Sequence, residues 1–257
     1  MMMYPINIYP VNDNYSQHTD QTEHINQPIF DCFEDKKERR KFIRKTFGLF
    51  LLSILSTFGS CLAFKYTSGS MNFVKSEAGQ AITVISLVST IIIMFITMCC
   101  DNLLRKSPIK YIIYTLFTFG ISWSVGVSAI YVKSNILIAA ILITTGTTTT
   151  LTLYSLITTS DFTGYTEYYI VGLVAIILTG TINIFLQNSV LQLLITGFGC
   201  LLFSFMIIYD VQMIVAQKHI KYKFSLDDSV LAAMSLYIDT VNLFIYILDF
   251  LTLTDRS

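Results

Sequence analysis

The sequence predicts an all-α membrane protein built as a bundle of seven helices. Of its 257 residues, 53% are hydrophobic and 13% are charged, whereas soluble domains have roughly 25% charged residues. The mean hydropathy is +0.61, and a soluble domain of this length could not bury so much apolar surface in one core. The zero net charge and the lack of a basic face exclude an electrostatic nucleic-acid binder.

The apolar segments have the length that a bilayer requires. A hydrocarbon core about 30 Å thick needs about 20 apolar residues in each spanning helix. All four prolines lie outside the apolar segments, so the helices should be largely unbroken. The polar residues of the last segment leave two paths open for it, a full crossing or a re-entrant hairpin. The seven segments cover roughly residues 46–64, 81–100, 111–132, 136–159, 168–186, 190–209 and 229–253.

The distribution of polar residues divides the chain into a tail and one membrane domain. Residues 1–35 are rich in Asn, Asp, Gln and Tyr without apolar periodicity, so we expect a disordered cytosolic tail. Short loops predict a single polytopic transmembrane domain over residues 36–257. Thirteen Lys and Arg residues lie on the side of the N-terminus and four on the other side. Because positive loops stay in the cytosol, we expect a cytosolic N-terminus, which opposes a seven-span receptor.

The carboxylates inside the predicted spans are the candidate functional groups. Asp210 ends the sixth span, and Asp239 lies near the middle of the seventh. Ionisable groups within a membrane are costly and usually functional. At 100° per residue, one face of the seventh helix forms a polar stripe about 80° wide. The stripe consists of Ser235, Asp239, Asn242, Tyr246 and Asp249.

The two aspartates could form a cation site if their helices pack together. Two anions at about 4 Å repel by about 4 kcal/mol at an effective dielectric constant of 20, so Asp210 and Asp239 would share one proton and titrate as a pair. Carboxylate oxygens suit Ca²⁺, and protonation would close such a site. We therefore interpret the stripe as an ion path with a pH sensor at Asp210 and Asp239, which are also the candidate Ca²⁺ ligands. The alternative is a central helix whose polar groups serve only packing.

Other polar and small residues in the spans have simpler explanations. The threonines between Thr144 and Thr150 could line a wet path, but threonine hydroxyls in helices usually bond back to their own backbone. Glycines in the later spans should permit close contact between helices. These glycines are Gly172, Gly180, Gly197 and Gly199.

The motifs oppose an enzymatic function. An intramembrane aspartyl protease would place an aspartate in Gly-x-Gly-Asp, but Asp239 follows Leu236-Tyr237-Ile238. Each of the three histidines lies outside the predicted spans, and neither His-Glu-x-x-His nor Gly-x-Ser-x-Gly occurs. We expect no enzymatic activity and no cofactor, with Ca²⁺ as a permeant or bound ion.

The stretch from Leu226 to Phe244 resembles the signature of the transmembrane Bax inhibitor motif family. Tyr209-Asp210 with Gln212 and the segment from Thr158 to Phe162 are also similar to the family pattern. The resemblance covers about residues 40–255 and is nearest to the Golgi anti-apoptotic branch, followed by the lifeguard branch. The chain has 35 isoleucines and 10 alanines, a bias typical of an AT-rich genome and compatible with a viral copy of a host gene.

The resemblance implies six helices around a central C-terminal seventh in Golgi or endoplasmic reticulum membranes. It further implies a Ca²⁺ leak from these stores and inhibition of apoptosis. The family's aspartate pair falls on Asp210 and Asp239, and its acidic residues that influence conduction fall on Asp227 and Asp228. Close relatives carry a glutamate in the third span, and this sequence has Trp123 at the corresponding position.

Two functional hypotheses follow. The first is a Ca²⁺-permeable leak channel of intracellular membranes that lowers store Ca²⁺ and inhibits apoptosis. The second is a membrane adaptor that inhibits apoptosis by binding death-pathway partners without conducting ions. The expected partners are the lipid bilayer, Ca²⁺ and apoptosis-regulatory membrane proteins. The sequence leaves open whether the protein forms a homo-oligomer.

Overall fold

The computed structural model describes residues 29–99, 108–215 and 228–256, and these residues contain helices and short connections but no β-strand. The all-α prediction is therefore confirmed. Seven of the helices are long and apolar enough to cross a membrane, and their positions agree with the seven predicted segments. The elements are α1 (Ile29–Tyr66), α2 (Ser70–Lys75), α3 (Glu77–Cys99), α5 (Ile109–Ile130), α6 (Ser134–Ile157), the 3₁₀ turn η1 (Thr163–Tyr165), α7 (Thr166–Leu186), α8 (Ser189–Val215) and α9 (Ser229–Arg256).

The first helix begins earlier than the sequence indicated. We expected an unstructured tail to residue 35, whereas α1 starts at Ile29. The charged residues before the first span are mainly Glu, Lys and Arg, which are good helix formers, so the helix extends beyond its apolar part. The rest of the expected tail, residues 1–28, lies outside the described residues.

Large apolar side chains cover the outside of the bundle. Leu52, Ile85 and Ile177 are 71%, 65% and 62% exposed. A soluble protein rarely exposes such extensive apolar surface, but lipid tails are as apolar as these side chains. The exterior thus agrees with a multi-pass membrane protein.

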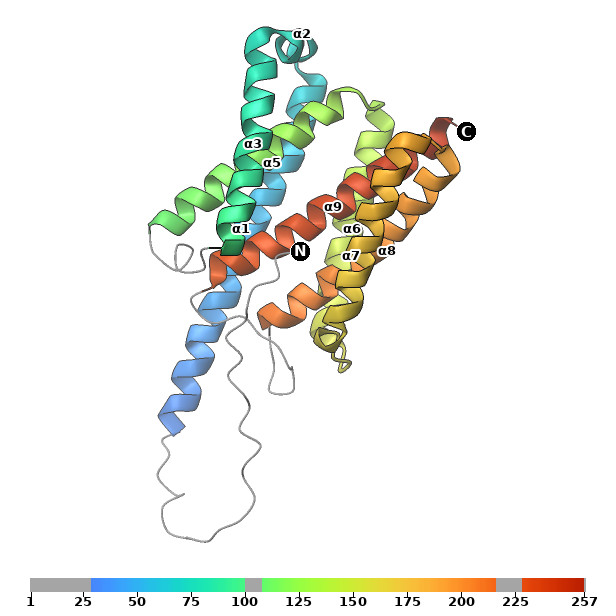
Figure 1. Ribbon diagram of the computed structural model, residues 1–257. Coiled ribbons are helices and arrows are strands. Elements are labelled where there is room, and N and C mark those ends of the chain that lie inside the picture. The colour runs from blue at the N-terminus through green and yellow to red at the C-terminus, as the bar shows by residue number, and fades with distance from the viewer. Residues whose placement is uncertain (1–28, 100–107, 216–227, 257) are drawn as a thin grey trace, which may run out of the picture.

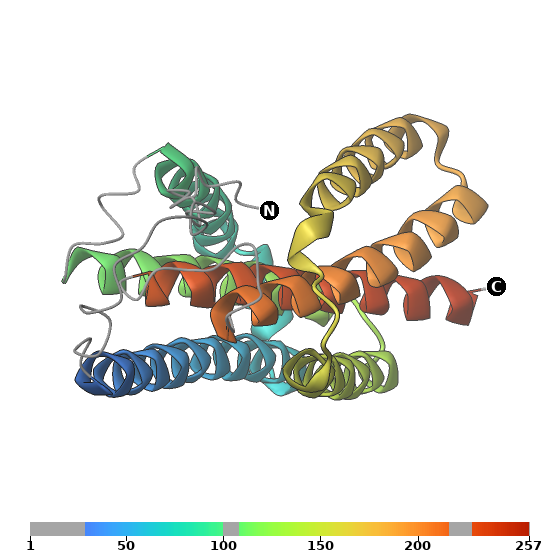
Figure 2. The same ribbon diagram turned by 90° about the horizontal axis from the view of Figure 1, so that it is seen from below.

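The last helix is the most deeply buried of the seven. In the most apolar part of α9, 78% of the residues are buried, compared with 17–44% in the other six spans. Figures 1 and 2 show α9 between two groups of helices, with α1, α3 and α5 on one side and α6, α7 and α8 on the other. It packs directly against α1, α5, α6 and α8, while α3 packs on α5 and α7 packs on α8.

The path of α9 is continuous. The helix runs without reversal from Ser229 to Arg256 over 28 residues, and 1.5 Å per residue makes it about 42 Å long. This length exceeds the hydrocarbon thickness of about 30 Å. Of the two paths that the sequence left open, the structure therefore favours the full crossing over the re-entrant hairpin.

Two of the four glycines expected at close helix contacts have that role. A Cβ at Gly172 would lie 2.7 Å from Leu202, and one at Gly199 would lie 2.6 Å from the ring of Tyr246. At Gly180 and Gly197 a Cβ would meet nothing within 4 Å. The prediction was wrong for these two because their α-carbons do not lie against a neighbouring helix.

Three hydroxyl groups in the threonine-rich part of α6 bond back to their own helix, whereas the buried Oγ1 of Thr148 has no hydrogen-bond partner among the described residues. Thr144, Thr145 and Thr149 each donate to the carbonyl oxygen four residues earlier, at 2.7 Å. These bonds confirm the structural interpretation of the segment. Its composition alone is thus no sign of an ion path.

Candidate functional site

Helices α8 and α9 bring the two predicted aspartates together. Asp210 and Asp239 are 3% and 2% exposed, and Asp210 lies within hydrogen-bonding reach of both Asp239 and Ser235. The contact arises because the polar stripe of α9 faces α8. Two carboxyl groups this close are compatible when they hold one proton between them, since an O–H group can then donate to the other carboxylate.

The pair keeps oxygen atoms available for a ligand. One oxygen of each carboxyl group, Oδ2, is buried without a hydrogen-bond partner among the described residues. Buried polar groups normally have partners, so these two oxygens require an explanation such as a proton or a cation. Among the described residues no cluster of three or more His, Cys, Asp or Glu side chains occurs. Because Ca²⁺ takes six to eight oxygens, it would have to keep part of its hydration shell here.

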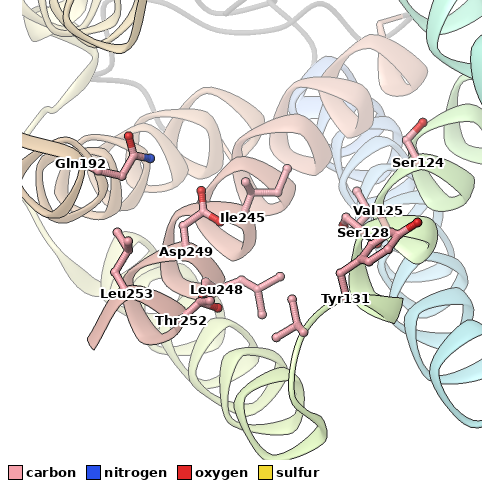
Figure 3. Close-up of a pocket in the computed structure, with 11 residues that line it drawn as sticks. Ser124, Val125, Ser128, Tyr131, Gln192, Ile245, Leu248, Asp249, Thr252 and Leu253 are labelled. Atoms are coloured by element: carbon pink, nitrogen blue, oxygen red, sulfur yellow. Dashed lines mark hydrogen bonds between the residues drawn. The ribbon is translucent and has the colours of Figure 1, made fainter. Parts of the chain in front are cut away.

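The rest of the polar stripe follows the same interface towards the C-terminal end of α9. Asn242 donates from Nδ2 to the carbonyl oxygen of Ile238 at 2.9 Å. The ring of Tyr246 stacks on Phe203 of α8, with 5.5 Å between centroids. Asp249 is exposed and lines a cavity near the ends of α5 and α9 (Figure 3). The members of the stripe differ in burial, from the buried Asp239 to the exposed Asp249, and a role of the stripe as an ion path stays a prediction.

Of the two acidic residues before the last helix, the structure describes Asp228. Asp227 lies outside the described residues. Asp228 is buried directly before α9, and its carbonyl oxygen accepts from the backbone N–H of Ala232 at 2.9 Å. An acidic residue at this position also favours the helix through its dipole. A role of Asp227 and Asp228 in conduction stays a prediction.

Gln212 ties the segment after α6 to α8. Its Oε1 accepts from the backbone N–H of Phe162 at 2.8 Å, and its Nε2 donates to the carbonyl oxygen of Ser160 at 2.7 Å. Asp161 in turn accepts from the N–H and the hydroxyl of Thr163 at 2.8 and 2.6 Å. The similarity to the family motif pointed to these positions, but their contact is visible only in the structure.

Arg39 is an interacting residue that sequence reasoning did not single out. Its guanidinium group donates to the carbonyl oxygens of Met213 and Ile214 and lies over the ring of Phe42 at 4.9 Å. A cation at the C-terminal end of α8 stabilises the helix dipole. The cluster of basic residues before the first span predicted the orientation of the protein in the membrane. Nothing in its sequence distinguished Arg39 from the neighbouring basic residues.

A buried hydroxyl network joins α9 to α1 and α5 on the side away from the aspartate pair. Thr57 of α1 contacts Tyr237 of α9 at 2.7 Å and Ser122 of α5 at 3.0 Å. Ser53 bonds to Tyr114 and Thr118 at 2.5 and 3.1 Å. Single serines and threonines in apolar helices carry little pattern, so the sequence did not predict this network.

The comparisons with known proteins agree with this architecture. Residues 39–256 match the family described as Inhibitor of apoptosis-promoting Bax1. The chain is 27% identical over 219 residues to the Golgi anti-apoptotic protein of Vaccinia virus (strain Lister), which covers 85% of this chain and 88% of the viral protein. It is 30% identical over 221 residues to protein lifeguard 4 of Mus musculus, covering 85% and 87% of the two chains.

A human relative extends the similarity. Protein lifeguard 3 of Homo sapiens is 26% identical over 221 residues, covering 84% of this chain and 70% of the human protein. The family match spans all seven apolar helices and includes Asp210 and Asp239. The chain is therefore a multi-pass membrane protein that belongs to the family of inhibitors of apoptosis-promoting Bax1.

Proposed function

We propose that the protein inhibits apoptosis as a Ca²⁺-permeable leak channel that lowers Ca²⁺ in the Golgi or endoplasmic reticulum. The observation that carries the proposal is the buried pair of Asp210 and Asp239 between two membrane-spanning helices. Intramembrane carboxylates are expensive and usually mark ion or proton paths. The family description supports the anti-apoptotic role, and the name of the viral relative supports both this role and the Golgi.

The pair would serve as a pH-sensitive binding site for a permeating cation. When both carboxyl groups are ionised, their negative charge attracts Ca²⁺; when they hold a proton, the attraction weakens. Two carboxylates provide fewer oxygens than a storage site requires, which suits an ion that binds briefly and leaves. In this proposal the carboxylates bind ions and catalyse no reaction, and the N-terminus faces the cytosol.

Ca²⁺ flux into liposomes that contain the purified protein tests the proposal. The Asp239→Asn variant keeps the size of the side chain but removes the charge, so we expect a large loss of flux and of its dependence on pH. Asp210→Asn should behave in the same way, and the double variant should add little because the two groups act as a unit.

The matched control is Glu77→Gln, which removes an exposed carboxylate in the first turn of α3. Its flux should equal that of the wild-type protein. Wild-type flux and pH response in Asp239→Asn would reject the channel site and favour the adaptor function.

A further inference from the structure

A cavity near the ends of α5 and α9 has mainly apolar walls and contains Asp249, the exposed carboxylate of the polar stripe. It has a volume of about 560 Å³ and is lined by residues of α5, of the start of α8 and of the end of α9 (Figure 3). This volume is large enough for many water molecules, since one water occupies about 30 Å³ in the liquid. The cavity lies at the end of α9 that is opposite to Ser229.

The lining of the cavity suits a hydrated cation. Asp249 is the one carboxylate among the lining residues, and Figure 3 shows its side chain and that of Gln192 reaching into the same space. The Oε1 atom of Gln192 accepts from Asn183 at 2.7 Å, which orients this amide. Four hydroxyl groups also line the cavity, and three of them donate to carbonyl oxygens of their own helices, so they can offer a cation only their oxygen lone pairs. The four belong to Ser124, Ser128, Tyr131 and Thr252.

Asp249 is the carboxylate that lines the cavity, and two lysines lie near its edge. Lys65 donates to the carbonyl oxygens of Ile130 and Val132. The cation Lys133 forms an ion pair with Asp255 at the end of α9, so it does not neutralise the cavity carboxylate. A carboxylate in a wet concave site concentrates cations because low-dielectric walls focus its field. Within a membrane span such a group is a functional candidate by default.

Asp249, which lines the cavity, and Asp239 of the aspartate pair lie at opposite edges of the polar stripe of α9, about 80° apart around the helix. Ten residues separate Asp239 from Asp249, which corresponds to about 15 Å along the helix. The side chain of Tyr246 lies between these two positions on the stripe. Its ring is stacked on Phe203 with an angle of 22° between the planes, and it fills the space beside Gly199.

We propose that this cavity is a hydrated cation vestibule and that Tyr246 closes it towards the aspartate pair. The proposal deepens the function proposed above and rests on it. In this arrangement Asp249 attracts the cation, and movement of the Tyr246 ring away from Gly199 and Phe203 connects the vestibule with Asp210 and Asp239.

Accessibility of introduced cysteines tests the vestibule without any measurement of flux. In a background whose five native cysteines are replaced, Asp249→Cys should react rapidly with a membrane-impermeant, positively charged thiol reagent. Asn242→Cys should be protected by Tyr246, and adding Tyr246→Ala should expose it. Protection of Asp249→Cys, or equal reactivity of Asn242→Cys with and without Tyr246, would overturn the inference.

Flux measurements in liposomes then test the roles of Asp249 and Tyr246. Asp249→Asn should reduce Ca²⁺ flux about three- to tenfold at low ionic strength, with a smaller deficit at high salt, because its attraction is screened. Glu77→Gln is the control for loss of an exposed carboxylate. A deficit that does not change with salt, or no deficit, would contradict the vestibule.

Substitutions at two glycines of α8 test whether Tyr246 closes the vestibule, because one glycine lies against Tyr246 and the other does not. Gly199→Ala places a methyl group against the Tyr246 ring, whereas Gly197→Ala meets nothing within 4 Å. We expect at least a twofold change in flux in Gly199→Ala and none in Gly197→Ala. Equal flux in the two variants would show that Tyr246 does not control the path. If the wild-type protein conducts no Ca²⁺ although Asp249→Cys reacts as expected, the channel function fails while the wet cavity remains.

Discussion

At the scale of single residues, Gln212 connects a loop to a membrane helix through both ends of its amide. Gln212→Leu should leave the N–H of Phe162 and the carbonyl of Ser160 without their partner, and each lost bond costs about 1 to 3 kcal/mol. We expect a lower unfolding temperature in detergent and faster proteolysis within residues 158–165. Gln212→Glu keeps an acceptor for Phe162 but places a buried carboxylate oxygen against the carbonyl oxygen of Ser160, so it should also lower the stability. Equal stability of all three proteins would show that the connection contributes nothing.

At the scale of helices, the hydroxyl network determines how α1, α5 and α9 fit together. Thr57→Val keeps the shape of the side chain but removes its bonds to Ser122 and Tyr237, leaving Tyr237 buried with one partner fewer. The expected loss of stability is about 0.6 to 1.7 kcal/mol, the range for hydrogen bonds between membrane helices. Unfolding in mixed micelles with increasing sodium dodecyl sulfate measures it.

Helix α6 supplies the control for this network. Thr145→Val removes an exposed hydroxyl group that bonds only to Ile141 of the same helix, so we expect nearly unchanged stability. A loss in Thr145→Val as large as that in Thr57→Val would mean that contact between helices is not the cause.

At the scale of the whole molecule, we expect the basic residues before the first span to orient the bundle in the membrane. Lys45 is exposed but lies over the ring of Tyr111 at 5.1 Å. Four others, Lys37, Arg40, Lys41 and Arg44, also have exposed side chains. Reversing these four charges and keeping Arg39, which binds α8, lowers the excess of Lys and Arg on the N-terminal side from thirteen against four to nine against four. We therefore expect a fraction of the protein to insert in the inverted orientation. Glycosylation tags at both termini report the orientation. An unchanged pattern of glycosylation would contradict the predicted topology.

The sequence by itself determined the seven spans and the acidic residues within them. Each span depends on the local cost of placing side chains in lipid, and Asp210 and Asp239 stand out because the surrounding residues are apolar. The periodicity of α9 likewise predicted one polar face. These properties require no knowledge of neighbouring helices, so they can be obtained from composition and spacing.

Only the tertiary structure decided which helices meet and at which rotation. Gly199 and Gly197 are both small residues in the same helix, yet only Gly199 lies against Tyr246. Arg39 and the bonds of Gln212 also became evident only once α8 had been placed. Lipid provides no hydrophobic force between helices, so their pairing depends on close packing and individual hydrogen bonds. Such contacts join residues far apart in the chain, and local sequence patterns therefore do not reveal them.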